Sequence, residues 1–318
     1  MQANLSIKGI PVQNIFTQYI NGYYLINRRY QRKLVWSIEE KAKFIDSILN
    51  GYPIPMILAA NYKKSDGSGA IEVLDGMQRI NAIVSFIEGE FPIAGHFFDL
   101  ESIALTKSRK DAGDLTQQYP TLPSDECARI LDYPVPFSIF DENEPSKLDE
   151  SFRRINTGGR TLSKQDVRQA GALGVIPETI NEVAMYIRKD GSHSNVVDLR
   201  YMKNISLSNK GLNYGINLNE VFWAKHGVIT YANLRMSRDE ELIAHLIACM
   251  AAPDTAQTTA HYLDKIYRSD SAESEDLAKQ INKHNKGILI KQFCFVFEEL
   301  KKAIEFDGAE FKNIGFKG

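Results

Sequence analysis

The chain has 318 residues, about twice the roughly 150 residues of a typical single domain, so its length fits one large domain or two. Hydrophobic residues make up 43% and charged residues 25%, which excludes a disordered chain, a collagen-like fibre and a disulfide scaffold. The net charge of −2 shows no global basicity, so a nucleic-acid role has to rest on local basic segments.

The cysteine pattern and the hydropathy pattern both predict a cytoplasmic protein. Cys127, Cys249 and Cys294 are odd in number and far apart, which is typical of a reducing compartment. The apolar stretch 242–252 is interrupted by His245 and is too short to span a bilayer, and the N-terminus lacks the order of a signal peptide. We therefore expect no membrane partner.

The first predicted helix begins at a capping box. Ser37 can accept a hydrogen bond from the third backbone N–H, and Glu40 can reach back to the N–H of Ser37. Apolar residues then recur at helical spacing up to Leu49. Gly51 can end this helix in the left-handed conformation.

Strands are predicted on both sides of a second helix. The apolar runs 56–60 and 71–74 suit buried strands, and the Asp-Gly pair at 75–76 turns the chain into a helix that Gly89 closes. Residues 133–140 contain Pro134 and Pro136, which predicts an edge strand.

The later part of the chain is predicted to be mostly helical. Ser163 can cap a helix that runs to about residue 172. Further helices are expected near 177–189, 219–225, 238–250, 260–268 and 291–304, with Pro253 and the stretch 269–276 as joints. We therefore predict an α+β first domain, 1–174, and a helical second domain, 175–318.

The first segment that can carry chemistry runs from Asp75 to Arg79. A strand that ends in Asp-Gly and enters a helix presents unpaired N–H groups, and these favour an anion such as phosphate. Arg79 can clamp phosphate oxygens, Gln78 can orient a water, and Asp75 can bind a metal or act as a base. The structural alternative is an Asp cap, a Gly turn and an Arg ion pair.

A basic and aromatic segment comes earlier in the chain. Its basic residues can contact phosphates and its rings can stack on bases. The basic members are Arg28, Arg29, Arg32 and Lys33, and the aromatic members are Tyr30 and Trp36. The alternative is a solvated basic stretch with Trp36 buried in the core.

A third segment lies around a Gly-Gly pair. Asn156, Thr157, Gly158 and Gly159 can present backbone donors to a ligand. The basic residues in and after this segment are Arg153, Arg154, Arg160, Lys164 and Arg168. The alternative is a helix C-cap followed by a tight helix–helix turn.

Several common sites are missing from the sequence. It contains no phosphate-binding loop of the Gly-x-x-x-x-Gly-Lys-Ser/Thr type, no Gly-x-Gly-x-x-Gly after a strand and no Gly-x-Ser-x-Gly elbow. None of the six histidines has the spacing of a zinc ligand, so the metal ligands, if any, stay unknown.

Taken in order, four segments resemble a known family. They are Tyr30-Gln31-Arg32 with Trp36, residues 46–55, residues 75–79, and residues 152–159 with Leu162-Ser163. Together they are similar to the GmrS-like N-terminal domain of GmrSD-type, modification-dependent (type IV) restriction proteins, in the ParB/sulfiredoxin-like superfamily. The resemblance covers about residues 15–170.

The resemblance implies an α+β core with nucleotide binding and hydrolysis at an Asp-Gly-x-Gln-Arg motif, and recognition of modified phage DNA. Carried onto this chain, the catalytic residues are Asp75, Gln78 and Arg79. The nucleotide-binding residues are Tyr30, Gln31, Arg32, Gly76, Asn156, Thr157, Gly158 and Gly159. The implied cofactors are an NTP, either GTP or ATP, and a divalent metal such as Mg²⁺.

Two departures from the family pattern matter. Met77 stands where the family usually has Gln, so an amide is absent from that position and the resemblance implies binding more firmly than hydrolysis. After Val175 there is no closely spaced His-Asn-His set, so DNA cleavage calls for a separate nuclease subunit.

The leading hypothesis is a nucleotide-dependent DNA sensor of a restriction or anti-phage system. In it, an NTP lies between segments 30–32, 75–79 and 156–159. The DNA-contacting residues would be Arg28, Arg29, Lys33, Arg153, Arg154 and Arg160. The alternatives are a non-catalytic nucleotide- or DNA-binding module that recruits a nuclease, and a metal-dependent nuclease. The oligomeric state stays open, and an oligomer is compatible with the sequence.

Overall fold

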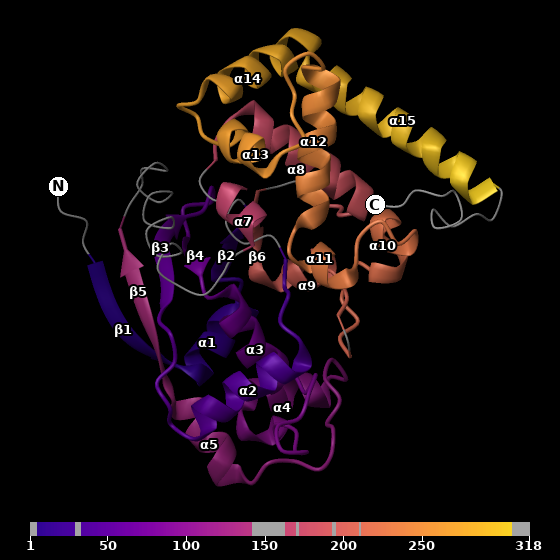
Figure 1. The fold of residues 1–318 in the computed structure, drawn as a ribbon. Coiled ribbons are helices and arrows are strands. Elements are labelled where there is room, and N and C mark those ends of the chain that lie inside the picture. The colour runs from indigo at the N-terminus through magenta and orange to yellow at the C-terminus, as the bar shows by residue number, and fades with distance from the viewer. Residues whose placement is uncertain are drawn as a thin grey trace. The chain divides into compact units, whose positions relative to one another are not determined.

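A mixed six-stranded sheet organises the early part of the chain in the computed structural model, which describes residues 5–28, 33–141, 163–169, 172–192, 195–209 and 211–306 (Figure 1). Its strands are β1 (Leu5–Pro11), β2 (Tyr24–Asn27), β3 (Ile57–Lys63), β4 (Gly69–Asp75), β5 (Pro134–Phe140) and β6 (Val196–Asp198). The strand order is β1-β5-β3-β4-β2-β6. β5 is parallel to β3 and β2 is parallel to β4, while the other neighbours are antiparallel.

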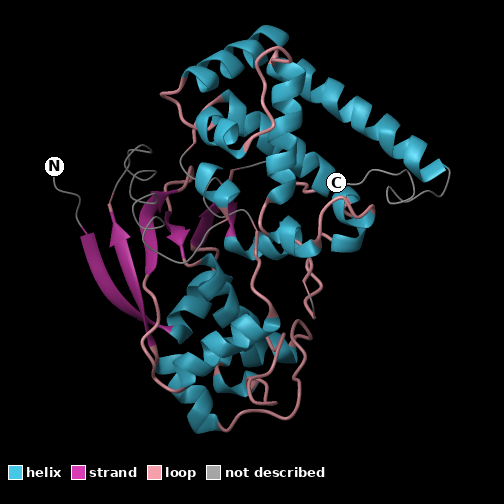
Figure 2. Ribbon diagram, in the orientation of Figure 1, coloured by secondary structure: helices cyan, strands magenta, loops and turns pink. Residues whose placement is uncertain are grey.

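Helices gather beside this sheet (Figure 2). The apolar side chains between the helices and the sheet are buried. They are α1 (Val12–Ile20), α2 (Ile38–Leu49), α3 (Met77–Ile87), α4 (Ala104–Asp111), α5 (Ser124–Asp132) and the short α9 (Met202–Ile205), with 3₁₀ turns η1 (Leu100–Ser102) and η2 (Leu199–Tyr201). Among the fully buried side chains are Phe16 of α1, Tyr24 of β2, Phe86 of α3 and Phe137 of β5. Burial of these large apolar surfaces holds the sheet and helices together.

The predicted capping box of α2 is confirmed. The Ser37 hydroxyl accepts from the Glu40 N–H at 3.3 Å, and the Glu40 carboxylate accepts from the Ser37 N–H at 2.8 Å. Gly51 follows this helix with φ +69°, as predicted for its end. The two predicted strands after it correspond to β3 and β4.

The prediction that residues 133–140 form an edge strand is wrong. β5 lies between β1 and β3, and β1 is the edge strand on that side. The prolines are tolerated because β5 pairs with β3 only from Phe137 onward, so Pro134 and Pro136 lie opposite β1 alone. β1 itself was not predicted, and four of its seven residues are exposed.

The remaining helices confirm an α+β chain with a helical later part. They are α7 (Lys164–Gln169), α8 (Val175–Arg188), α10 (Phe222–Lys225), α11 (Tyr231–Arg235), α12 (Arg238–Ala251), α13 (Ala260–Ile266), α14 (Ala272–His284) and α15 (Lys286–Phe306), with the 3₁₀ turn η3 (Leu218–Glu220). The predicted joint 269–276 is only partly a joint. Ser271 caps α14 by accepting from the Ser274 N–H at 3.0 Å, and the helix begins at Ala272.

The chain forms two compact units, and the first of them includes a segment from later in the sequence. One unit contains residues 1–148 and 194–215, and the other contains residues 149–193 and 216–318. The segment 194–215 contributes β6, which pairs with β2, and α9. The predicted division at residue 174 and the ParB-like superfamily assignment stay predictions. Within the described residues, no helix has the length and apolar character needed to cross a bilayer.

Candidate functional site

The turn between β4 and α3 has the predicted strand–turn–helix geometry. β4 ends at Asp75, Gly76 is the only residue between, and α3 begins at Met77. Gly76 has φ +112°, and a Cβ at this position would lie 2.8 Å from the Cγ1 of Ile57 in β3. Glycine is therefore required both by the backbone conformation and by the packing against β3. The turn brings the start of α3 next to the end of β4.

Asp75 and Arg79 form an ion pair across this turn. A guanidinium nitrogen of Arg79 donates to a carboxylate oxygen of Asp75. The Arg79 side chain is only 10% exposed, whereas that of Asp75 is 33% exposed. The structural alternative of an Arg ion pair is thus present in this state. An incoming phosphate has to compete with Asp75 for the guanidinium.

Gln78 is engaged with the backbone of the basic and aromatic segment. Its Oε1 accepts from the N–H of Val35 at 3.0 Å and of Trp36 at 3.2 Å. Its Nε2 donates to the carbonyl of Lys33 at 2.9 Å. We predicted from the sequence that Gln78 orients a water, but its amide holds residues 33–36 against α3. It is a positioning residue in this structure.

Two later residues hold the same segment from the other side. The Leu34 N–H donates to the hydroxyl of Ser206 at 2.8 Å, and the amide of Asn209 donates to the carbonyls of Val35 and Trp36. The Trp36 ring packs edge-on against Phe44 with centroids 5.5 Å apart. Residues 33–36 are therefore fixed by side chains instead of by a strand ladder, with Trp36 against the core.

Met77, the departure from the family motif, faces the core. Its side chain is 1% exposed. Because this position is buried, the thioether fills apolar space where an amide would need hydrogen-bond partners. The substitution therefore alters the interior behind the turn, and Asp75, Gln78 and Arg79 keep their places around it.

Most of the other predicted site residues lie outside the described residues. They are Arg29, Tyr30, Gln31, Arg32, Arg153, Arg154, Asn156, Thr157, Gly158, Gly159 and Arg160. Their predicted roles, and the predicted pocket between segments 30–32, 75–79 and 156–159, stay predictions.

Of the described members of the basic segments, only Lys164 is exposed, and three others are buried or paired. Arg28 is 4% exposed and Lys33 is 7% exposed. Arg168, in the other unit, pairs with Asp264 at 2.7 Å and with Glu241 at 3.8 Å. A buried or paired cation contributes little to a surface that tracks phosphates, so these three residues do not support the predicted DNA surface.

The described ranges contain no group of three or more His, Cys, Asp or Glu side chains placed to bind a metal ion. Mg²⁺ bound together with a nucleotide uses one or two carboxylates plus phosphate oxygens, and Asp75 supplies one such carboxylate. The turn therefore fits a metal that arrives with a nucleotide.

A cluster of charged side chains at the other end of α3, one buried and three half-buried, was not predicted. Lys41 of α2, Lys203 of α9, and Glu88 and Glu90 after α3 meet there. One signal was available, because Lys41 lies three residues after Ile38 and four before Ile45, on the apolar face of its helix. Lys203 lies too far along the chain for any local pattern to connect it with Glu90.

Comparison with known families identifies the chain. The model of the GmrSD restriction endonuclease N-terminal domain matches residues 12–173, just over half of the chain. The chain belongs to the GmrSD N-terminal domain family. No curated protein matches it. The matched range runs from α1 through α7 and contains the turn at Asp75–Arg79.

Membership in the GmrSD N-terminal domain family confirms the resemblance found in the sequence. It connects the chain with restriction and defence, a process that acts on DNA. The GmrSD match includes the buried Met77 and its neighbours, so the turn described above belongs to the part of the chain that defines the family.

Proposed function

We propose that this chain is the nucleotide-dependent DNA-sensing component of a restriction or anti-phage system, which binds and hydrolyses an NTP at the turn Asp75–Arg79. The observation that supports this most directly is the Arg79–Asp75 pair at the start of α3, within the GmrSD match. A guanidinium held beside a helix N-terminus is suited to phosphate. GTP and ATP are both compatible with this geometry.

In the proposed site, each residue of the turn has a separate task. Arg79 exchanges its partner Asp75 for phosphate oxygens, with help from the first N–H groups of α3. Asp75, released from the guanidinium, takes the proton of the attacking water or carries a nucleotide-bound Mg²⁺. Such a metal would supply charge neutralisation at the phosphates.

Gln78 acts indirectly in this proposal. By holding residues 33–36, it fixes the end of the segment whose Tyr30, Gln31 and Arg32 we propose as nucleotide contacts. Asn156, Thr157, Gly158 and Gly159 are proposed to complete the site.

A second candidate function is a non-catalytic module that binds a nucleotide as a signal and recruits a separate nuclease. The observation that favours it is the commitment of the Gln78 amide to three backbone groups. A side chain that is already engaged in this way is not placed to orient an attacking water. In this alternative, nucleotide binding survives and turnover is absent.

Phosphate release decides between the two candidates. The full chain is incubated with each of the four NTPs and Mg²⁺, with and without modified and unmodified DNA. Binding is measured in parallel with a fluorescent nucleotide analogue. Release above the background of an Asp75→Asn variant supports the NTPase, and binding without release supports the module. Absence of both contradicts the assignment of this turn.

Contact with DNA is a separate part of the proposal. Binding to duplex DNA should weaken with salt, with a log–log slope near −0.9 for each phosphate contacted. Titrations at two salt concentrations, with and without nucleotide, measure this slope. If duplex DNA does not bind at low salt in any nucleotide state, DNA contact belongs to the partner nuclease.

A further inference from the structure

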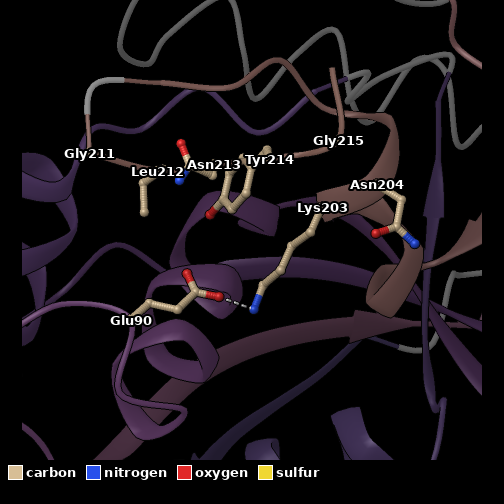
Figure 3. A pocket seen from close by; sticks show the side chains of 8 residues that line it. All are labelled: Glu90, Lys203, Asn204, Gly211, Leu212, Asn213, Tyr214 and Gly215. Atoms are coloured by element: carbon tan, nitrogen blue, oxygen red, sulfur yellow. Dashed lines mark hydrogen bonds and ion pairs between the residues drawn. The ribbon is translucent and has the colours of Figure 1, made fainter. Parts of the chain in front are cut away.

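The charge cluster at the C-terminal end of α3 borders a cavity of about 450 Å³ (Figure 3). α3 rises by about 1.5 Å per residue, so this cavity is on the order of 15 Å from the turn at Asp75–Arg79. Its lining consists of Glu90, Lys203, Asn204 and the loop Gly211 to Gly215. In Figure 3, the Lys203 side chain extends from α9 toward Glu90 and passes Tyr214.

The acidic members of the cluster are held by strong contacts. Lys203 Nζ donates to Glu88 Oε2 at 2.8 Å and also to Glu90 Oε1, and Arg109 donates to Glu88 Oε1 at 3.0 Å. Burial alone would lower the pKa of Lys203, but Glu90 and Glu88 raise it above its ordinary value. Burial would raise the pKa of Glu90, yet Lys203 and Lys41 hold it below its usual range. Both groups of this pair are charged near neutral pH.

Lys41 is the third cation and has no strong carboxylate partner. Its side chain is 0% exposed. Nζ donates to the hydroxyls of Ser85, at 2.9 Å, and of Tyr214, while Glu90 Oε2 is 3.8 Å away. Burial lowers the pKa of Lys41 to about 7. Among the described residues, no donor makes a hydrogen bond to the buried Glu90 Oε2.

The cluster has one more cation than it has carboxylates when Lys41 is protonated. Lys41, Lys203 and Arg109 supply three positive charges when Lys41 is protonated, against two from Glu88 and Glu90. Tyr214 and the nearby Tyr19 stay neutral, because burial raises their pKa values, that of Tyr19 to about 12. An excess buried charge is costly, so it is either lost by deprotonation or matched by an anion.

We propose that this cavity binds a small oxyanion of single negative charge, and that binding returns a proton to Lys41. The donors available to such a ligand are the third N–H of Lys203 and the amides of Asn204 and Asn213, for which the described residues provide no partner. Tyr214 connects the cavity wall to Lys41 through its hydroxyl. A carboxylate and a phosphodiester share this chemistry.

The proposal fixes the sign of the pH dependence. Below pH about 7, Lys41 is already protonated and binding needs no proton. Above pH about 7, Lys41 takes up one proton for each anion that binds, so the affinity for the anion falls by up to tenfold for each pH unit. A site that used only Lys203 and the two amides would show no such dependence in this range.

Calorimetry on the full chain tests this with three probes: acetate, a dinucleotide that carries one phosphodiester, and, at pH 6 only, inorganic phosphate, which is mostly a dianion at pH 8. Titrations at pH 6 and pH 8, in buffers of different ionisation enthalpy, measure affinity and proton uptake together. Saturable binding with proton uptake at pH 8 is expected for at least one probe. The probe that binds shows whether a free metabolite or a nucleic-acid phosphate is the source.

Two variants and one control complete the experiment. Asn213→Ala removes an exposed donor of the cavity and should weaken binding about tenfold with the fold intact. Lys41→Met should abolish proton uptake, and Lys43→Gln, on the exposed face of the same helix, should change nothing. If Lys41→Met does not fold, the wild-type proton uptake and Asn213→Ala still decide.

The proposal is overturned if no probe binds at millimolar concentration, if binding takes up no proton at pH 8, or if Asn213→Ala binds as tightly as the wild type. It is independent of the proposed nucleotide site, since Asn213→Ala and Lys41→Met should leave binding of the fluorescent nucleotide analogue unchanged.

Discussion

Gln78 and Val35, 43 positions apart in the chain, are joined by a 3.0 Å hydrogen bond from the Val35 N–H to the Gln78 side-chain oxygen. Through this contact, the first turn of α3 holds a segment that has no strand partner. Two parts of the family motif that are distant in sequence are thereby one structural unit. This contact gives the glutamine of the motif a structural role that does not depend on any role in nucleotide hydrolysis.

Replacement of Gln78 by Ala should lower the free energy of unfolding by about 1–3 kcal/mol, because the N–H groups of Val35 and Trp36 and the carbonyl of Lys33 lose their partner. Urea unfolding measures the loss. Gln13→Ala, an exposed glutamine of α1, is the control and should stay within about 0.5 kcal/mol of the wild type. Equal effects of the two substitutions would contradict the positioning role.

Arg79→Ala and Asp75→Asn should separate binding from turnover. Loss of the guanidinium removes a charged hydrogen bond to phosphate, worth about 1.5–3 kcal/mol, so nucleotide affinity should fall roughly tenfold to 150-fold. Asp75→Asn keeps Arg79 available to phosphate and should retain binding while hydrolysis stops. Fluorescent-nucleotide titration and phosphate release measure the two effects.

The control for these variants is Arg129→Ala, which removes an exposed arginine paired with Glu126 on α5. It should bind and turn over nucleotide as the wild type does. Unchanged affinity in Arg79→Ala, with a normal melting curve, would reject phosphate contact by this residue.

Gly76→Ala should destabilise the chain more than Gly67→Ala. Both glycines have positive φ, +112° and +84°, so both substitutions strain the backbone at a cost of about 1–2 kcal/mol. Only at Gly76 does the added Cβ meet a neighbour, Ile57 Cγ1 at 2.8 Å, whereas Gly67 has open space around it. Thermal unfolding of the two variants isolates the contribution of packing against Ile57. Equal shifts in Tm would mean that β3 moves to accommodate the added Cβ at no cost in stability.

Arg188→Met should destabilise the helical unit by about 3–5 kcal/mol. Arg188 Nε and Nη2 donate to the two carboxylate oxygens of Asp239 at 2.6 and 2.7 Å, and Nη2 lies 2.7 Å from Glu240. All three side chains are buried, so removal of the cation takes a charged partner away from two buried carboxylates. Arg268→Met, which breaks the exposed pair with Asp270, should leave the urea midpoint unchanged. A small effect at Arg188 would mean that water reaches the carboxylates.

Local patterns in the sequence predicted the elements that local chemistry determines. The capping box at Ser37, the turn at Gly76 and the strand β4 depend on residues within a few positions of one another. The interior position of β5 was missed because it depends on β1, more than 120 residues earlier in the chain. A strand's own sequence does not report which neighbours will cover its edges.

The sequence predicted which residues form the turn of the candidate site, but it did not predict all of their contacts. Asp75 and Arg79 are four residues apart and their pairing was anticipated as the structural alternative. The hydrogen bonds of the Gln78 amide were not predicted, because its partners are backbone groups. Every residue carries such groups, so no sequence pattern identifies them as partners. Lys203 and Tyr214 were missed for a similar reason, since Lys203 reaches Glu90 and Tyr214 reaches Lys41 only through the return of the chain at residues 194–215.

That return has a consequence for the order in which the chain is made. When a ribosome has synthesised the chain as far as residue 173, where the family match ends, strand β6 does not yet exist to pair with β2. At that point Glu88 and Glu90 also lack their cation partner Lys203. The family domain as delimited by its matched residues is therefore not a complete folding unit in this protein. The first unit is complete in sequence only when residue 215 has been synthesised, after residues 149–193 of the second unit and before its residues 216–318.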